Sequence, residues 1–119
     1  MVHTAAAAGG LPGDMLKLWR PATPGSYHRL VHVKDCDLAL LQEVCRSGGG
    51  LMEAWDRGVF CELGHGTAGL EPFLEALRAR GYEGWVTVEQ DRFLKPEDTP
   101  EALLALHTRN REWLRARGL

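Results

Sequence analysis

Charged and polar side chains end two short apolar runs of the sequence, and these side chains have the clearest capacity for chemistry. His32, Lys34 and Asp35 lie in the stretch LVHVKD, and Glu89 follows the valines of GWVTVE. Both runs favour β-strands. A His and a Glu from neighbouring strands can supply half of a divalent-metal site, because both side chains are metal ligands. The alternative is a hydrogen-bonded histidine and a solvated glutamate at two strand ends.

Alternation along a strand decides which of these side chains share a face. Val31 and Val33 point to one face of the first predicted strand, and His32 points to the other. In the second predicted strand, Glu89 lies on the face opposite to Val86 and Val88. The valines suit packing against covering helices. In a β/α-barrel the polar face would be the interior, and active sites are built where the strands end.

The elements that must position these residues alternate between strand and helix. From the sequence we predict a helix at 14–19, a strand at 29–35, two short helices within 37–57 broken by three glycines, and an extended piece at 59–63. A helix from Leu70 closed by Gly81, a strand at 84–91 that ends in acidic residues, and a last helix capped by Thr99 follow. This alternation predicts parallel β/α units. Two or three parallel strands make a poor free-standing sheet, because both faces need to be covered.

Four residues near these strands are weaker candidates for binding a substrate. Lys34 and Asp35 could bind substrate hydroxyls, or could form ion pairs at the rim of the sheet. His65 lies in LGHGTAG, where glycines would let it approach a ligand, although an exposed loop explains it equally well. Trp85 shares a face with Glu89 and could form an aromatic wall for a sugar-like ring, whereas filling the barrel is the more common role.

Composition excludes several classes of function. The chain has 119 residues, enough for one domain over 1–119, and a net charge of −2 without a basic stripe, which argues against nucleic-acid binding. The sequence contains no apolar run of about 20 residues and no convincing signal peptide, so we expect a cytoplasmic protein without a membrane span. Cys36, Cys45 and Cys61 lack the spacing of a disulfide framework or a zinc site.

Three motifs in register resemble a known family. HVKDCD, RGVFCELGHG and GYEGWVTVEQD, in this order, are similar to the C-terminal half of the xylose-isomerase-like sugar isomerase/epimerase barrels. Within that family the chain is most similar to inosose dehydratase, which has a helical insert like residues 38–57. The resemblance implies a partial (β/α)8 TIM barrel: the C-terminal two to three β/α units, with the helical insert before the last unit.

The resemblance also implies a metal, a substrate class and a reaction. Members bind one divalent metal, commonly manganese or cobalt, through Glu, Asp, His and Glu. Here the ligand His corresponds to His32 and the last ligand Glu to Glu89. In the epimerases this Glu also moves a proton next to a carbonyl, so Glu89 would be the catalytic base. The implied substrate is a polyol or keto-sugar, and the implied enzyme is a lyase or an isomerase/epimerase.

Two of the four family ligands have no counterpart in this sequence. The strand that carries the first Glu is absent, since a complete barrel takes about 250 residues. Met1 and Thr4 stand where the family has its ligand Asp and its neighbouring His, and His3 is at best a shifted substitute. The family pattern therefore predicts a chain that completes its site with a missing N-terminal half or with a second copy of itself.

Three functions follow from these observations. The first is the C-terminal half of a metal-dependent sugar or cyclitol enzyme, and its alternative is a truncated, non-catalytic remnant of the same family. The third, a nuclease of the related endonuclease barrels, is the weakest, because it needs a basic groove and a richer metal cluster.

Overall fold

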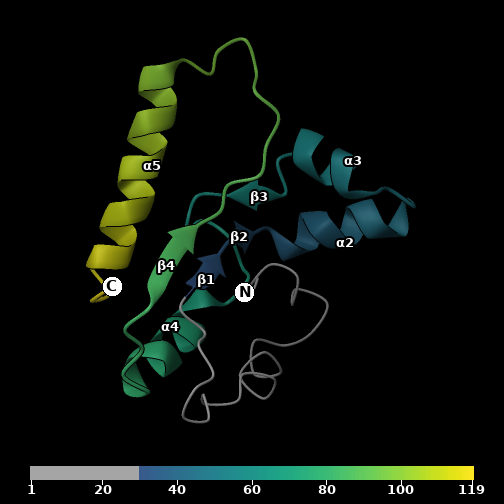
Figure 1. The fold of residues 1–119 in the computed structure, drawn as a ribbon. Helices are drawn as coiled ribbons and strands as arrows, with labels where there is room; N and C mark the ends of the chain where they lie inside the picture. Colours follow the sequence, from purple (N-terminus) through teal and green to yellow (C-terminus); the bar gives the residue numbers. More distant parts are fainter. Residues whose placement is uncertain (1–29) are drawn as a thin grey trace.

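The computed structural model of the protein describes residues 30–119 (Figure 1). The elements in chain order are β1 (Leu30–Val33), β2 (Asp35–Cys36), α2 (Leu38–Arg46), α3 (Leu51–Asp56), β3 (Phe60–Cys61), α4 (Leu70–Ala79), β4 (Trp85–Val88) and α5 (Pro100–Arg115). The described chain is thus a mixed α/β structure with two small sheets, and these residues form no closed barrel. The helix predicted at 14–19, together with Met1, His3 and Thr4, lies outside the described residues.

The two strands predicted to carry chemistry lie side by side. β1 and β4 pair in parallel, with His32 opposite Thr87 and Val33 opposite Val88. The chain between them passes through α2, α3, β3 and α4 before it returns (Figure 1). Because parallel strands end at the same edge of a sheet, the residues that follow Val33 and Val88 meet there. The prediction that these two strands are parallel is confirmed.

The first predicted strand is divided in the structure. The prediction of one continuous strand through Asp35 is wrong, because β1 ends at Val33 and the next two residues form β2, which pairs antiparallel with β3. The expectation of parallel units alone fails for the same pair. The reason lies at Asp35, whose carboxylate accepts hydrogen bonds from the backbone N–H groups of Gly64 and Gly66 and so directs the chain toward the β3–α4 loop.

The segment after β2 forms two short helices, as predicted. Asp37 caps α2, since its Oδ1 accepts hydrogen bonds from the backbone N–H groups of Ala39 and Leu40 at 3.0 Å. Gly48 then adopts φ 77°, a left-handed conformation that favours glycine and separates α2 from α3. The α2–α3 pair extends away from the parallel sheet (Figure 1).

The core forms where the valine face of the parallel sheet meets α4 and α5. Val31 and Val33 are 0% exposed and pack with α4. The four apolar positions that predicted this helix are all buried: Leu70, Phe73, Leu74 and Leu77. The amphipathic helix and the covered valine face are therefore both confirmed. A smaller cluster around Val44 and Val59 joins α2 and α3 to β2 and β3.

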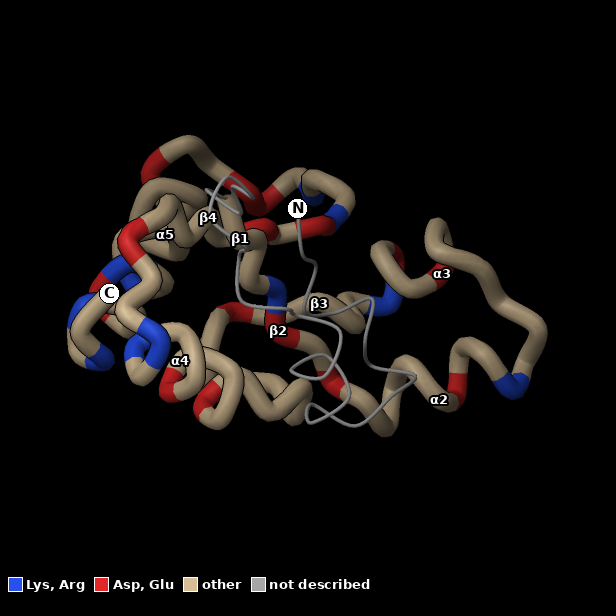
Figure 2. The backbone as a smooth tube through the Cα atoms, turned by 60° about the horizontal axis from the view of Figure 1, so that its bottom comes forward, with Lys and Arg blue, Asp and Glu red and all other residues tan. Residues whose placement is uncertain are grey.

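Positive and negative residues alternate along the backbone of the described chain (Figure 2). None of the helices within residues 30–119 has both the length and the apolar character needed to cross a membrane.

Candidate active site

The C-terminal ends of β1 and β4 bring a histidine and a glutamate together. His32 points from β1 and Glu89 directly follows β4, and His32 Nδ1 lies 2.9 Å from Glu89 Oε2. The backbone N–H of Glu89 also donates to the carbonyl of Val33 at 2.9 Å, which extends the parallel pairing by one residue. The prediction that these two side chains share a face is confirmed. Their role as metal ligands stays a prediction.

A lysine and a second carboxylate complete this group. Lys34 Nζ lies 2.5 Å from Glu89 Oε1 and 2.6 Å from Asp91 Oδ2. We call His32, Lys34, Glu89 and Asp91 the acid–base cluster. Alternation along the chain could have identified Asp91, because it stands two residues after Glu89 and therefore on the same side.

Partial burial makes the charges of the acid–base cluster interdependent. The side chain of Lys34 is 8% exposed, and those of Glu89 and Asp91 are 25% and 28% exposed. Burial opposes the charge on Lys34, but hydrogen bonds and attraction from Asp91 and Glu89 outweigh it and raise the pKa of Lys34. The ammonium thus lies within hydrogen-bonding distance of both carboxylates.

The hydrogen bond between His32 and Glu89 indicates which ring nitrogen of His32 carries a proton. An ionised carboxylate only accepts, so Nδ1 of His32 is the donor. Glu89 thus has one oxygen against an imidazole N–H and the other against an ammonium. A carboxylate held in this way is oriented and can receive a proton from a bound molecule.

The cluster fits a divalent ion in part. Two ligand atoms that each lie about 2.1 Å from one ion are about 3–3.4 Å apart, so His32 Nδ1 and Glu89 Oε2, at 2.9 Å, could both contact one ion only if Nδ1 gave up the proton that it donates to Glu89. Within residues 30–119, however, no group of three or more His, Cys, Asp or Glu side chains is arranged to hold an ion. Residues 30–119 therefore supply two possible metal ligands, His32 and Glu89. Glu89 is also hydrogen-bonded to the ammonium group of Lys34.

Asp35 has a different environment from its neighbour Lys34. It is 3% exposed, and its Oδ2 accepts from the N–H groups of Gly64 and Gly66, at 2.8 and 3.1 Å. Its Oδ1 accepts from the N–H groups of Cys36 and Ala68. The carboxylate holds the β3–α4 loop in place. The prediction that Asp35 binds a substrate hydroxyl is untested and stays a prediction.

The other two residues predicted to bind substrate lie farther away. Trp85 shares the sheet face of Glu89 and is 78% exposed, but it stands four residues earlier, about 13 Å along the strand. His65 is exposed in the β3–α4 loop, where its charge acts on Glu62. A substrate at the acid–base cluster would need considerable length to reach Trp85. Both predictions remain untested.

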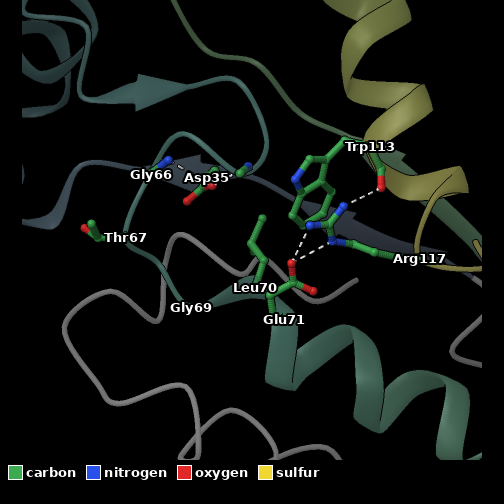
Figure 3. Close-up of a pocket in the computed structure, with 9 residues that line it drawn as sticks. Asp35, Gly66, Thr67, Gly69, Leu70, Glu71, Trp113 and Arg117 are labelled. Atoms are coloured by element: carbon green, nitrogen blue, oxygen red, sulfur yellow. Dashed lines mark hydrogen bonds and ion pairs between the residues drawn. The ribbon is translucent and has the colours of Figure 1, made fainter.

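A cavity of about 260 Å³ lies next to the β3–α4 loop (Figure 3). Its lining residues are Asp35, Gly64, Gly66, Thr67, Gly69, Leu70, Glu71, Trp113 and Arg117. Arg117 donates to Glu71 and to the carbonyl of Trp113, and its guanidinium lies 3.6 Å from the centre of a Trp113 ring. The charged groups here are hydrogen-bonded within the protein, as those of the acid–base cluster are. The acid–base cluster is the better candidate for an active site because it lies where the parallel strands β1 and β4 end.

Two amide side chains near the acid–base cluster, Gln90 and Asn110, were not predicted from the sequence. Gln90 and Asn110 are hydrogen-bonded to each other at 3.3 Å, and Asn110 is 1% exposed. The signal for Asn110 was a polar residue in the apolar stripe of α5, between Leu106 and Leu114, both of which are buried. Helical spacing of four residues on either side places all three on one face.

Part of the sequence is similar to curated enzymes. It is 38% identical over 64 residues to inosose dehydratase of Geobacillus thermodenitrificans, a match that covers 54% of this chain and 22% of the relative. Part of this chain is thus similar to inosose dehydratases. The inosose dehydratase of Bacillus licheniformis is 31% identical over 64 residues, covering 54% of this chain and 21% of the relative. That of Klebsiella pneumoniae is 29% identical over 90 residues, covering 76% and 29%.

These matches cover less of the relatives than of this chain. The chain spans less than a third of the length of each curated inosose dehydratase that it matches. No family model matches the sequence, and no solved structure matches it significantly. The similarity supports the resemblance to xylose-isomerase-like sugar enzymes at the level of the family.

Proposed function

We propose that this chain carries the C-terminal part of the active site of a divalent-metal-dependent enzyme that acts on a cyclitol or keto-sugar in the cytoplasm, as inosose dehydratases act on an inosose. The observation that carries the proposal is the contact between His32 and Glu89 at adjacent ends of parallel strands. The similarity to inosose dehydratases supports the choice of substrate class.

In this proposal His32 and Glu89 hold one divalent ion, manganese or cobalt. When bound, the ion would polarise the carbonyl and hydroxyl oxygens of the substrate and make the neighbouring C–H acidic. Glu89 removes that proton, because its carboxylate is already oriented by His32 and Lys34. Lys34 holds the other oxygen of this carboxylate, with Nζ 2.5 Å from Oε1.

The fate of the proton distinguishes the two reactions of the family. In a dehydratase, removal of the proton next to the carbonyl is followed by loss of the β-hydroxyl as water. In an isomerase, Glu89 returns the proton to the neighbouring carbon. In an epimerase, a proton returns to the same carbon from the opposite face, so a second group must donate it. The similarity to inosose dehydratases favours the dehydratase.

The remaining metal ligands would come from outside the described residues. β1 and β4 each pair on one edge within residues 30–119, and such edges accept a further strand. We propose that a polypeptide with the N-terminal β/α units, or a second copy of this chain, supplies those strands and ligands.

The test is turnover of an inosose by the full chain with Mn²⁺, alone and mixed with the N-terminal part of a related inosose dehydratase. We expect Glu89→Gln to lower the rate at least about a hundredfold, as loss of a general base does. Glu83→Gln is the matched control, because Glu83 is exposed just before β4. Equal rates for the two variants would contradict the role of Glu89.

A second candidate function is a non-catalytic remnant of the same family. The observation in its favour is that, within residues 30–119, no group of three or more His, Cys, Asp or Glu side chains is arranged to hold a metal ion. A folded chain without turnover in either mixture would support this alternative.

A further inference from the structure

A chain of three hydrogen bonds runs behind the acid–base cluster. The backbone N–H of Leu63 donates to Asn110 Oδ1 at 2.8 Å. Asn110 Nδ2 donates to Gln90 Oε1 at 3.3 Å, and Gln90 Nε2 donates to the backbone carbonyl of Phe60 at 3.3 Å. The chain therefore links α5 and the segment after β4 to β3 and to the turn that follows it.

The two ends of this chain fix its direction. A backbone N–H can only donate, so Asn110 must turn its oxygen toward Leu63 and its nitrogen toward Gln90. A backbone carbonyl can only accept, so Gln90 must turn its nitrogen toward Phe60. Each amide thus has one orientation that satisfies both neighbours. A buried amide that loses such partners destabilises the fold.

Gln90 stands between the two carboxylates of the acid–base cluster. Glu89 and Asp91 both reach Lys34 on one side of the chain, whereas Gln90 reaches Asn110 on the other side. A bond that holds Gln90 toward α5 therefore holds its two neighbours away from α5 and toward Lys34.

We propose that Asn110 is a positioning residue, which acts through Gln90 to aim Glu89 and Asp91 at Lys34 and His32. Neither amide touches the proposed metal or substrate. The chemical role of the two carboxylates rests on the proposed function. Their orientation rests only on the contacts described above.

The variants Gln90→Met and Asn110→Leu test the proposal in the full chain. Gln90→Met keeps the length of the side chain and removes both of its hydrogen bonds. Glu62→Gln is the matched control: it weakens the bonds from Arg109, at 2.8 and 2.7 Å, which also join α5 to the turn after β3. Gln90 is half-buried, so Gln90→Met decides the test if Asn110→Leu does not fold.

Two readouts separate positioning from a loss of stability. The first is NMR of the wild-type chain and each variant at a temperature where all are folded, following the Nδ1 proton of His32 and the ammonium protons of Lys34. The second is the dissociation constant for Mn²⁺ alone, measured by electron paramagnetic resonance. We expect Gln90→Met to lose both proton signals and to bind Mn²⁺ about 10- to 100-fold more weakly. The control should keep the wild-type values.

Unchanged proton signals in folded Gln90→Met would overturn the proposal, and so would an equal loss in Glu62→Gln. If the wild-type chain shows the proton signals but binds no Mn²⁺, either alone or mixed with the N-terminal part of a related inosose dehydratase, the proposed function fails. The proton signals then decide the positioning proposal by themselves.

Discussion

At the scale of single residues, Asp35 turns the chain from one sheet toward the next. Its buried carboxylate accepts from four backbone N–H groups, three of them in the β3–α4 loop. Hydrogen bonds to charged groups contribute about 1.5–3 kcal/mol each, and buried donors without partners add to the loss. We expect Asp35→Ala to lower the free energy of unfolding in urea by about 3 kcal/mol or more. The exposed Asp56 provides the control Asp56→Ala, and a similar small effect of both changes would contradict this role.

Cys36 gives a residue-scale prediction about pH. Burial, then the negative charges of Asp35 and Asp37, raise the pKa of the Cys36 thiol from 9.0 to about 11. Between these values the unfolded chain has released the proton and the folded chain still holds it. The folded state therefore loses stability as pH rises, by about 1.4 kcal/mol per pH unit for one thiol.

Between pH 9 and pH 11, the unfolding free energy of Cys36→Ala should fall less steeply with pH than that of the wild-type chain. The difference in slope should be at most about 1.4 kcal/mol per pH unit. Urea unfolding at several pH values would measure it. Cys45 is exposed on α2, so Cys45→Ala should leave the decline unchanged. Identical slopes in the wild-type chain and Cys36→Ala would show that folding does not raise the pKa of the Cys36 thiol.

At the scale of elements, α5 covers the polar chain behind the acid–base cluster and begins at a defined cap. Thr99 Oγ1 accepts from the backbone N–H of Ala102 at 3.2 Å, and Pro100 holds the first helical position. We expect Thr99→Ala to cost about 1 kcal/mol in the free energy of unfolding, as the loss of an N-cap does.

The matched control for this cap is Thr108→Ala on the exposed side of the same helix. Thr108 Oγ1 bonds back to the carbonyl of Leu104, and alanine favours a helix at that position, so the change should be neutral or slightly stabilising. Equal losses in both variants, measured by denaturant unfolding, would argue against a specific cap.

Local patterns in the sequence were enough to predict the helices and the parallel strands. The i, i+3, i+4 spacing of Leu70, Phe73 and Leu74 identified α4, and alternation placed His32 and Glu89 on one face. These signals depend on neighbours within a few residues. They correspond to the elements that the structure confirms.

The features that escaped prediction depend on partners far along the chain. The end of β1 is set by the bonds of Asp35 to N–H groups about 30 residues later. Asn110 meets Leu63 across 47 residues. Periodicity carries no information about such distant partners, so the antiparallel sheet and the amide chain became visible only in the structure.

At the scale of the whole molecule, the described chain brings together two proposed ligands, His32 and Glu89, at one edge of a two-stranded sheet. The chain spans less than a third of each inosose dehydratase that it matches. The central claim is therefore that this edge binds a divalent ion when the remaining ligands are supplied by other residues or another copy.

The most direct test is a thermal melt by near-UV circular dichroism, first in EDTA and then in excess Mn²⁺, of the full chain alone and mixed with the N-terminal part of a related inosose dehydratase. An ion that binds only the folded state adds about 2.7 kcal/mol at a hundred times its dissociation constant. We expect a cooperative melt that Mn²⁺ shifts upward, alone or in the mixture, with the wild-type chain and with Glu83→Gln, but not with Glu89→Gln. A cooperative melt that ignores Mn²⁺ in both samples, or one that shifts equally with Glu89→Gln, would contradict the central claim.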